Sequence, residues 1–299
     1  MTTPVNSNTP LWARILRICL SSSAAAFVMS AACNAPTGAV PEIHAHRGGG
    51  ALKPENSLLA IRYSVSDVGV NAVEFDVNQT SDKGLVINHN LRINPAICIN
   101  ADGSPITDPP LIAEITLSQA RAYDCGTPTG QPSGTPLPLL SEVFETVNQI
   151  SNPPIQSRFD MHVKWNRTSI SPDDYVALLL KTINAENVLG QVNLLTSDPE
   201  ILDAAFRAEP RLPLYFIVPG ITPDVMRTAT QTHVAALLPA DLSFSATDVD
   251  TLHLQGYKVI PFTVNSPTRW PILMGMGVDG IITDDPLSLR NLIYPPSPQ

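Results

Sequence analysis

The stretch that decides the fold is "VEFDVNQTSDKGLVINHN", which runs from Val73 to Asn90. Side chains alternate along a strand, so Glu74 and Asp76 point to one face while their apolar neighbours point to the other. Two carboxylates this close repel each other unless a positive charge lies between them. The stretch therefore predicts a strand with one apolar face and one face that holds either a salt-bridge cluster or a metal ion.

Apolar runs of strand length recur along the chain, and helical patterns separate most of them. In one such pattern Leu58, Ile61, Val65 and Val68 lie on one helical face, and Gly69 ends the helix. Strands that alternate with helices indicate a parallel sheet, and eight such units predict an α/β fold, a closed (β/α)8 TIM barrel. The predicted strands are residues 42–46, 72–77, 158–163, 192–196, 212–218, 241–246, 258–264 and 279–283.

The composition of the 299-residue chain is that of a globular protein, with 43% hydrophobic and 15% charged residues. The net charge of -9 argues against nucleic acid as a partner, because no basic stripe is present to meet its phosphates. We predict that residues 42–295 form one domain.

Residues 1–32 have the character of an export signal, because Arg14 and Arg17 precede an apolar, small-residue stretch without acids. A retained membrane helix needs about 20 strongly apolar residues. We therefore expect a cleaved signal peptide and an exported protein that is periplasmic, a cell-envelope lipoprotein or secreted. Cys33 follows two alanines as in a lipoprotein signal, but Ser30 stands where a larger aliphatic residue is usual. The sequence leaves open whether Cys33 carries a lipid anchor, which would be the protein's one contact with a membrane.

The second and third predicted strands lie much farther apart than the other neighbours. We assign the excess, about residues 79–138, to an insertion after the second strand that covers the barrel mouth. Its short run "LVINH", which ends at His89, is expected to return along the second strand as a hairpin. In an exported protein Cys98 and Cys125 are expected to form a disulfide, and two separate thiols are the alternative.

Polar residues gather where the predicted strands end, and active sites of such barrels form at the carboxyl ends of the strands. We expect His89 to join them and His44, His233 and His253 to be structural or surface residues. The polar residues at the strand ends are His46, Arg47, Glu74, Asp76, His162, Lys164, Thr263, Asn265, Thr283 and Asp284. The last four, from Thr263 on, are expected to shape the mouth rather than perform chemistry.

Several motifs resemble those of the glycerophosphodiester phosphodiesterase family, whose members are TIM-barrel phosphodiesterases similar to phosphatidylinositol phospholipase C. The matching stretches are "HAHRGGGALKPENSLLAI", "VEFDVNQTSDKGLVINHN", "FTVN" and "GVDGIITDDP", within residues 42–292. The resemblance implies a metal-dependent enzyme that hydrolyses glycerophosphodiesters to sn-glycerol 3-phosphate and an alcohol. It also implies a divalent cation, Ca²⁺ or Mg²⁺, and a small-molecule substrate.

The resemblance also implies roles for individual residues. His46 and His89 would be the catalytic general base and general acid, because imidazole titrates near neutral pH. Arg47 and Lys164 would bind the substrate phosphate. Glu74 and Asp76 would bind the metal with a third ligand from the third strand, and a salt-bridge cluster with the two cations is the alternative. The residues expected to support the site are Glu55, Asn56 and Asn90.

Three positions depart from the family pattern. In "FDMHVKW", His162 takes the place of the usual glutamate ligand, so either His162 or Asp160 supplies the third ligand, or the site has lost one ligand. A nitrogen ligand favours Mn²⁺ or Zn²⁺ over Ca²⁺ and Mg²⁺. Asn90 replaces an aspartate after His89, and Phe262 replaces a tryptophan. A phospholipase that acts on a lipid headgroup and a catalytically impaired phosphodiester-binding protein remain as alternatives.

Overall fold

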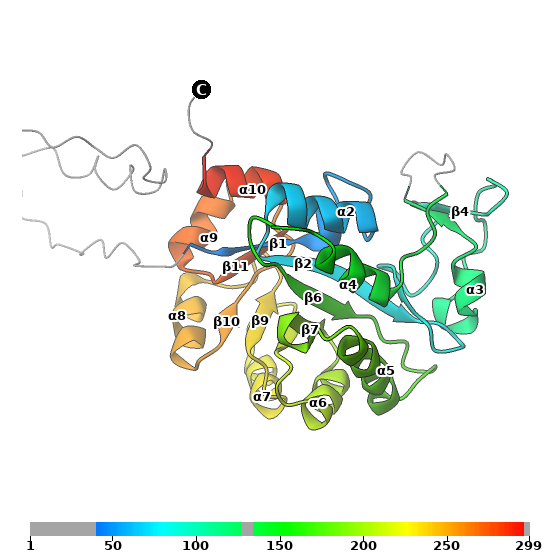
Figure 1. The fold of residues 1–299 in the computed structure, drawn as a ribbon. Helices are drawn as coiled ribbons and strands as arrows, with labels where there is room; N and C mark the ends of the chain where they lie inside the picture. Colours follow the sequence, from blue (N-terminus) through cyan, green and yellow to red (C-terminus); the bar gives the residue numbers. More distant parts are fainter. Residues whose placement is uncertain (1–39, 127–133, 296–299) are drawn as a thin grey trace, which may run out of the picture.

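Eight parallel strands form the body of the protein. The computed structural model describes residues 40–126 and 134–295, so the predicted signal segment 1–32 and Cys33 lie outside the described residues. The strands follow the order β10-β9-β8-β7-β6-β2-β1-β11 (Figure 1). They are β1 Glu42–Ala45, β2 Ala72–Gln79, β6 Arg158–Val163, β7 Val192–Thr196, β8 Leu214–Val218, β9 Ala236–Pro239, β10 Lys258–Val259 and β11 Gly280–Thr283.

The two ends of this strand order meet, which closes the sheet into a barrel. The N–H of Asp279 donates to the carbonyl of Val259 at 2.9 Å, and the N–H of Ile282 donates to that of Pro261 at 3.0 Å. These bonds join β11 to the segment that contains β10. The predicted (β/α)8 barrel is therefore confirmed.

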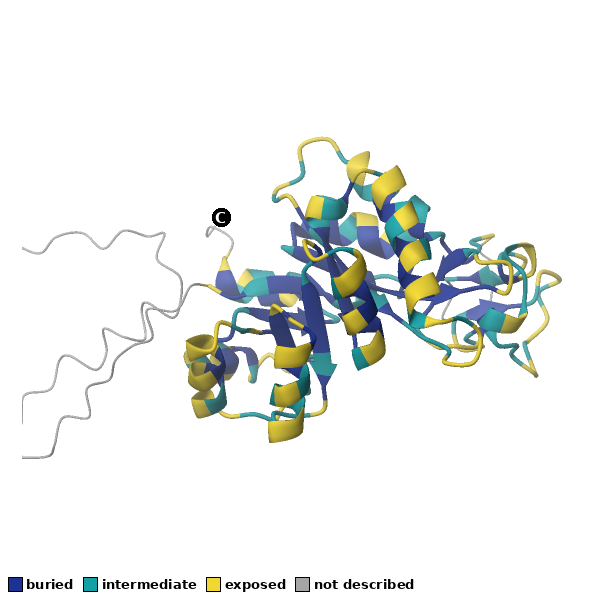
Figure 2. Cartoon of the chain, turned by 90° about the horizontal axis from the view of Figure 1, so that it is seen from below, coloured by how far each residue is buried: buried dark blue, intermediate teal, exposed yellow. Residues whose placement is uncertain are grey.

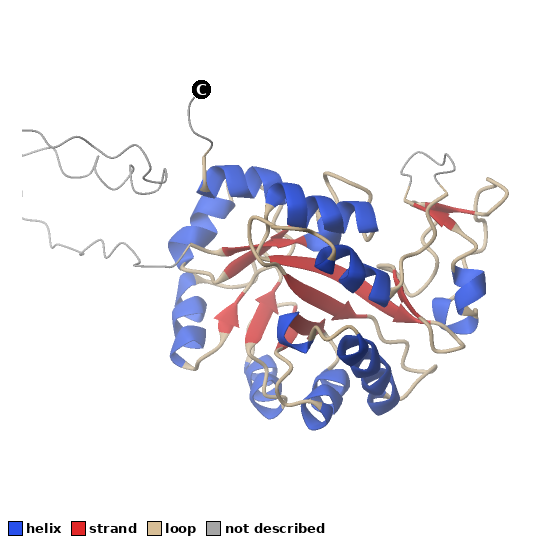
Figure 3. Ribbon diagram, viewed as in Figure 1, coloured by secondary structure: helices blue, strands red, loops and turns tan. Residues whose placement is uncertain are grey.

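Helices surround the barrel on its outside (Figure 3). Their exposed faces point to solvent, while the strands lie buried beneath them (Figure 2). On the outer face of β2 and β6, Phe75 and Phe159 pack edge-to-face with Phe144 of α4. The helices are α2 Leu58–Tyr63, α4 Leu140–Asn148, α5 Pro172–Ala185, α6 Pro199–Ala208, α7 Pro223–Gln231, α8 Ala246–Leu254, α9 Trp270–Met276 and α10 Pro286–Ile293. Within the described ranges, no helix combines the length and the apolar character that a membrane span requires.

The first helix ends where its sequence pattern predicts. Helix α2 continues as a π-helical turn, Ser64–Val68, and stops at Gly69, whose φ of 73° is left-handed. The N–H of Gly69 donates to the carbonyl of Ser64 at 2.9 Å, which closes the last turn. Glycine adopts this conformation without the steric cost that a Cβ would bring.

The predicted strand at residues 241–246 is wrong. The strand in this region is β9, and its four residues "ALLP" are all buried. Residues 241–245 form the loop to α8, which Ser245 caps by accepting a hydrogen bond from the N–H of Asp248. The stretch "DLSFSA" alternates polar and apolar residues as a half-buried strand does. A strand buried on both faces is instead a short continuous apolar run.

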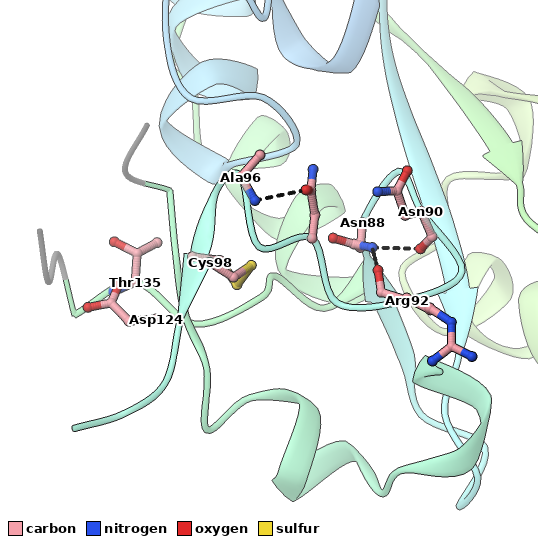
Figure 4. Close-up of a disulfide and its surroundings, with 9 residues drawn as sticks. Asn88, Asn90, Arg92, Ala96, Cys98, Asp124 and Thr135 are labelled. Carbon is pink, nitrogen blue, oxygen red and sulfur yellow. Dashed lines mark hydrogen bonds between the residues drawn. A yellow bond between two sulfur atoms is a disulfide. The ribbon is translucent and has the colours of Figure 1, made fainter. Parts of the chain in front are cut away.

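The insertion after β2 begins with the predicted hairpin. Strand β3, Leu85–Ile87, pairs antiparallel with β2, with Val77 opposite Ile87. Farther along, β4 Cys98–Ile99 pairs antiparallel with β5 Asp124–Cys125, and helix α3, Leu117–Ala120, lies between them in sequence. Cys98 and Cys125 form the expected disulfide (Figure 4).

Candidate active site

The turn after β1 forms the first part of the mouth. His46–Gly48 form a 3-10 turn in which Arg47 is left-handed, with φ 50°. The backbone N–H of Arg47 donates to Glu74 Oε2 at 2.7 Å. Gly48 is also left-handed, and a Cβ there would lie 3.0 Å from the Cβ of Ala60 in α2. Glycine therefore lets this turn pack against α2 while the two preceding residues reach the mouth.

Two buried carboxylates of β2 lie at the mouth. The exposed fraction of Glu74 is 2% and that of Asp76 is 0%. Asn56 donates from Nδ2 to Asp76 Oδ2 at 2.9 Å, and its Oδ1 accepts from the Asp76 N–H at 3.1 Å. Like Arg47, Asn56 is left-handed, with φ 54°. Non-glycine residues in this conformation gather at functional sites, where surrounding contacts offset the strain.

Strand β6 brings His162 and Lys164 to the same carboxylates. His162 Nδ1 lies 3.0 Å from Asp76 Oδ1 and 3.6 Å from Glu74 Oε1, and Lys164 Nζ lies 3.1 Å from Asp76 Oδ1. Burial works to lower the pKa of His162, but the neighbouring carboxylates of Asp76 and Glu74 raise it. Glu74, Asp76 and His162 each offer one ligand atom, and these atoms lie within 4.8 Å of one another. This arrangement suits a metal ion.

Asp160, the other predicted candidate for the third ligand, lies deeper in the barrel. Its Oδ2 lies 2.5 Å from His44 Nδ1, and its Oδ1 accepts from Asn193 Nδ2 at 2.7 Å. Both carboxylate oxygens therefore already have buried partners. His44, for which a structural or surface role was expected, is fully buried.

His46 is held by a carboxylate from β11. Its Nδ1 lies 2.6 Å from Asp284 Oδ1, and Asn265 Nδ2 donates to Asp284 Oδ2 at 2.6 Å. Burial works to lower the pKa of His46, but the hydrogen bond to Asp284 and the charge of Glu74 raise it. A carboxylate on Nδ1 orients the ring and favours the protonated imidazole.

The loop after β3 carries His89, and two buried amides hold this loop. Asn78 Nδ2 donates to the carbonyl of Asn88 at 2.5 Å. Asn88 Nδ2 donates in turn to the carbonyl of Asn90 at 2.6 Å and to that of Arg92 at 3.0 Å (Figure 4). These bonds fix the backbone on both sides of His89.

The surroundings of His89 favour its neutral form. Burial lowers its pKa, and the charges of Lys164 and Arg47 act in the same direction, against the charge of Asp76. His89 Nδ1 lies 2.9 Å from Asn90 Oδ1, which is an uncharged partner. His46 and His89 therefore have pKa values displaced in opposite directions.

Five buried side-chain polar atoms of the described residues have no aligned hydrogen bond, and three of them lie at the mouth: Arg47 Nε, Glu55 Oε1 and Asp76 Oδ1. Arg47 connects them, because its NH1 donates to Glu55 Oε2 at 2.8 Å and its Nε lies 3.8 Å from Asp76 Oδ2. Asp76 Oδ1 has only the ion-pair contacts described above. A buried polar atom without a partner costs about 1–3 kcal/mol. Of the three atoms, Glu55 Oε1 has no partner, whereas Arg47 Nε and Asp76 Oδ1 have ion-pair contacts but no aligned hydrogen bond. The group therefore suits a ligand that would complete the bonding.

The structure thus brings together most of the residues that the sequence placed at the mouth, namely His46, Arg47, Glu74, Asp76, His162, Lys164, Asn265, Thr283 and Asp284. The role of Asp284 differs from the prediction, because it was expected to shape the mouth and it contacts His46 directly. The sequence feature that could have indicated this role is the position of Asp284 at the carboxyl end of a barrel strand, in "GIITDDP". The exposed His233 and the exposed His253, which lies 2.8 Å from Asp279, have no contact with this site.

The fold and the grouping of acids, histidines and cations at one barrel mouth are those of the TIM-barrel phosphodiesterases. A model of the glycerophosphoryl diester phosphodiesterase family matches residues 46–288, and the chain belongs to that family. The family resemblance in the sequence, and with it the prediction of a phosphoric diester hydrolase, is confirmed.

Individual relatives agree with this assignment. The glycerophosphodiester phosphodiesterase of Caldanaerobacter subterraneus subsp. tengcongensis is 25% identical over 250 residues, 83% of this chain and 96% of the relative. A family structure from Silicibacter pomeroyi DSS-3 superposes with a TM-score of 0.77 at 23% identity, covering 85% of this chain and 93% of that chain. The structure of an Oleispira antarctica phosphodiesterase in complex with the product sn-glycerol-3-phosphate superposes with a TM-score of 0.74 at 21% identity, covering 85% of this chain and 97% of that chain.

Proposed function

We propose that the barrel mouth hydrolyses glycerophosphodiesters to sn-glycerol 3-phosphate and an alcohol with the help of a divalent cation. The observation that carries this proposal is the group of buried atoms without an aligned hydrogen bond at Arg47, Glu55 and Asp76. A phosphate oxygen would accept a hydrogen bond from the Arg47 donor. A hydroxyl group of the substrate and a cation would bind the carboxylate oxygens of Glu55 and Asp76. Family membership and the product complex of the Oleispira antarctica phosphodiesterase support it.

The residues present fit a metal ion. Glu74, Asp76 and His162 would hold it, because their ligand atoms lie together and Asp76 Oδ1 lacks an aligned donor. Two carboxylates suit Ca²⁺ or Mg²⁺, and the imidazole makes Mn²⁺ or Zn²⁺ the alternative. A bound cation would offset the repulsion of the two acids and polarise a phosphoryl oxygen. Asp160 takes no part in this proposal, because His44 and Asn193 occupy its oxygens.

The opposite pKa shifts of the two histidines favour the reverse of the roles that the resemblance implied, with His89 as the base and His46 as the acid. His89, whose pKa is lowered, removes a proton from the attacking water as general base. The water oxygen bonds to phosphorus, and the bond from phosphorus to the leaving alcohol breaks. His46, whose pKa is raised, donates its proton to that alcohol oxygen as general acid. The products are the phosphomonoester and the free alcohol.

The cationic side chains position the phosphate. Arg47 offers a phosphate oxygen its Nε, which makes no aligned hydrogen bond, and Lys164 adds a second positive charge. Glu55 keeps the guanidinium in place and has one carboxylate oxygen free for a glycerol hydroxyl. Asn56 orients Asp76, and Asn90 orients His89.

The test is hydrolysis of glycerophosphocholine by protein that has been stripped with a chelator and supplied with Ca²⁺, Mg²⁺, Mn²⁺ or Zn²⁺. We expect turnover that depends on added metal. His162→Glu is expected to lower the Ca²⁺ concentration for half-maximal activity about tenfold, because it adds a third hard, charged ligand. The exposed His233, in the loop between α7 and β9 at the opposite end of the barrel, provides the control His233→Glu.

Two outcomes would contradict this proposal. Turnover that survives complete chelation would show that hydrolysis does not depend on a metal ion. Absence of turnover with every metal, in both the natural protein and His162→Glu, would favour a phosphodiester-binding protein on the same scaffold.

We also propose that the protein is exported and that residues 1–32 are removed. The disulfide between Cys98 and Cys125 supports this, because structural disulfides persist in oxidising compartments. Mass spectrometry of the protein recovered from its native host would give the new N-terminus. A mass increase at Cys33 would identify a lipid anchor, and an intact residue 1 would overturn the proposal.

A further inference from the structure

Strand β2 belongs to the barrel on one side and to the insertion on the other. Its Val77 pairs with Val163 of β6 and also with Ile87 of β3. Strand β6 ends at Val163, whereas the next two residues of β2 continue along β3. The barrel and the insertion therefore separate at Val77. Lys164, which contacts the substrate phosphate in the proposed function, follows β6 directly at this point.

Hydrogen bonds connect the backbone of Lys164 to β2 and to α5. Its N–H donates to the carbonyl of Val77 at 2.9 Å. The hydroxyl of Tyr175 donates to the same Val77 carbonyl at 2.9 Å and lies 3.3 Å from the carbonyl of Lys164. One hydroxyl proton is thus shared between two carbonyls, and the bond to Val77 is the shorter. Because a small cavity borders Lys164 here, packing alone does not fix its position.

Tyr175 is itself held firmly. It is 1% exposed and lies in the first turn of α5, which has Pro172 at its first position. Ser171 caps this helix, because its hydroxyl accepts from the Asp174 N–H at 3.1 Å and donates to the Asp174 carboxylate at 2.7 Å. Burial raises the pKa of Tyr175, so its hydroxyl remains a neutral donor. A helix on the outside of the barrel thus fixes two carbonyls at the mouth.

We propose that Tyr175 is a positioning residue that holds Lys164 in place for the substrate phosphate. The inference rests on the proposed function, because that function gives Lys164 its contact with the phosphate. The Lys164 ammonium lies 3.1 Å from Asp76 Oδ1, and Asp76 directly precedes Val77. A shift of the Lys164 backbone relative to Val77 would therefore displace the ammonium from both the carboxylate and the phosphate. A displacement of about 1 Å can lower a rate about 100-fold.

The first test removes the hydroxyl and keeps the ring. In Tyr175→Phe the carbonyl of Val77 still accepts from the Lys164 N–H, so we expect the fold to be preserved. Isothermal titration calorimetry of the full-length protein with Mg²⁺ would measure the binding of sn-glycerol 3-phosphate, a probe that requires no turnover. We expect its dissociation constant to rise about fivefold, which is the effect of one hydrogen bond. The dissociation constant of Mg²⁺ is expected to stay unchanged, because the residues that would hold the cation are intact.

A double-mutant cycle shows whether Tyr175 acts through Lys164. In the background of Lys164→Gln, the addition of Tyr175→Phe is expected to leave the dissociation constant of sn-glycerol 3-phosphate unchanged, because the ammonium that it positions is gone. A purely structural loss would weaken binding by the same factor in both backgrounds. That result would overturn the positioning role.

A matched control is Tyr257→Phe. The Tyr257 hydroxyl lies 3.1 Å from Thr230 Oγ1 of α7, at the opposite end of the barrel from the mouth. This variant is expected to bind sn-glycerol 3-phosphate as the natural protein does. Unchanged binding in Tyr175→Phe as well would overturn the positioning role while the proposed function stands.

Two further outcomes separate this inference from the proposed function. Weaker binding in Tyr175→Phe, with no turnover by the natural protein, would support the positioning role and contradict hydrolysis. If the natural protein bound no sn-glycerol 3-phosphate, Lys164 would have no phosphate to contact, and the inference would be wrong.

Discussion

His46 Nδ1 lies 2.6 Å from Asp284 Oδ1, although 238 positions separate the two residues in sequence. This contact raises the pKa of His46 against the effect of burial. Because the proposed general acid must be protonated, Asp284→Asn is expected to lower kcat about 100-fold. It should also move the alkaline limb of the pH–rate profile to lower pH. Rates of glycerophosphocholine hydrolysis between pH 5 and 10 would measure both effects.

The control for this substitution is Asp224→Asn, which makes the same chemical change on the exposed surface of α7, where the Asp224 side chain is 82% exposed. It is expected to leave the rate and the profile unaltered. A similar profile for Asp284→Asn would show that Asp284 only shapes the mouth, as its sequence position first indicated.

The sequence was sufficient to predict the barrel and most of the site, because both follow from the alternation of side chains along parallel strands. Glu74 and Asp76 face inward for this reason, and the carboxyl ends of the strands bring them near His46 and His162. Strand β9 was missed because both of its faces are buried. A run of four apolar residues has no alternation to detect, whereas the loop after it alternates by chance.

The sequence could not predict which side chains would pair across the barrel. Asp160 and His162 lie two residues apart on the same face of β6, so alternation alone allowed either to bind a metal. The relative heights of the strands in the barrel decide between them, since they place His44 of β1 and Asn193 of β7 against Asp160. The pairing of Asp284 with His46 likewise depends on where β11 lies beside β1.

Asn90 gives a second prediction for the pH profile. Its Oδ1 lies 2.9 Å from His89 Nδ1, and the pKa of His89 is lowered by burial. Asn90→Asp would place a negative charge on this nitrogen and raise that pKa. Because the general base must be neutral, the acid limb of kcat/KM is expected to move up by about one pH unit. A limb that stays in place would show that His89 is not the base.

A matched control lies in the same insertion. Asn94 Oδ1 accepts from the Ala96 N–H at 3.1 Å, a bond that an aspartate can keep. Asn94→Asp therefore adds the same charge without a contact to His89. It is expected to leave the acid limb unchanged, which separates a local effect on His89 from a general effect of net charge.

His44 predicts a dependence of stability on pH. Burial works to lower its pKa, but Asp160 and Glu42 raise it from 6.5 to about 9. The folded protein therefore holds this proton more tightly than the unfolded chain. The stabilisation is complete below pH 6.5, declines above it and is lost as the pH rises through about 9. A shift of this size corresponds to about 3 kcal/mol.

Urea unfolding of the natural protein and of His44→Gln would measure this contribution. The difference in their free energies of unfolding is expected to be about 3 kcal/mol larger at pH 6 than at pH 10. Titrations elsewhere in the protein are common to both and cancel. A difference that stays the same at the two pH values would mean that folding does not shift the pKa of His44.

The disulfide gives the last prediction, which concerns the insertion rather than the barrel. Cys98 and Cys125 are 27 positions apart and lie in a small apolar core with Val86 and Ile93. Val86 and Ile93 precede and follow the loop that carries His89. Closing such a loop stabilises the fold by about 3.5 kcal/mol in the chain-entropy model. We expect the double Cys→Ala variant to keep the circular dichroism of the barrel but to lose about tenfold in kcat, because His89 is less well positioned. Dithiothreitol should slow the natural enzyme to a similar degree and leave the variant unaffected, and an undiminished kcat in both would show that the amides of Asn78 and Asn88 suffice to hold the loop.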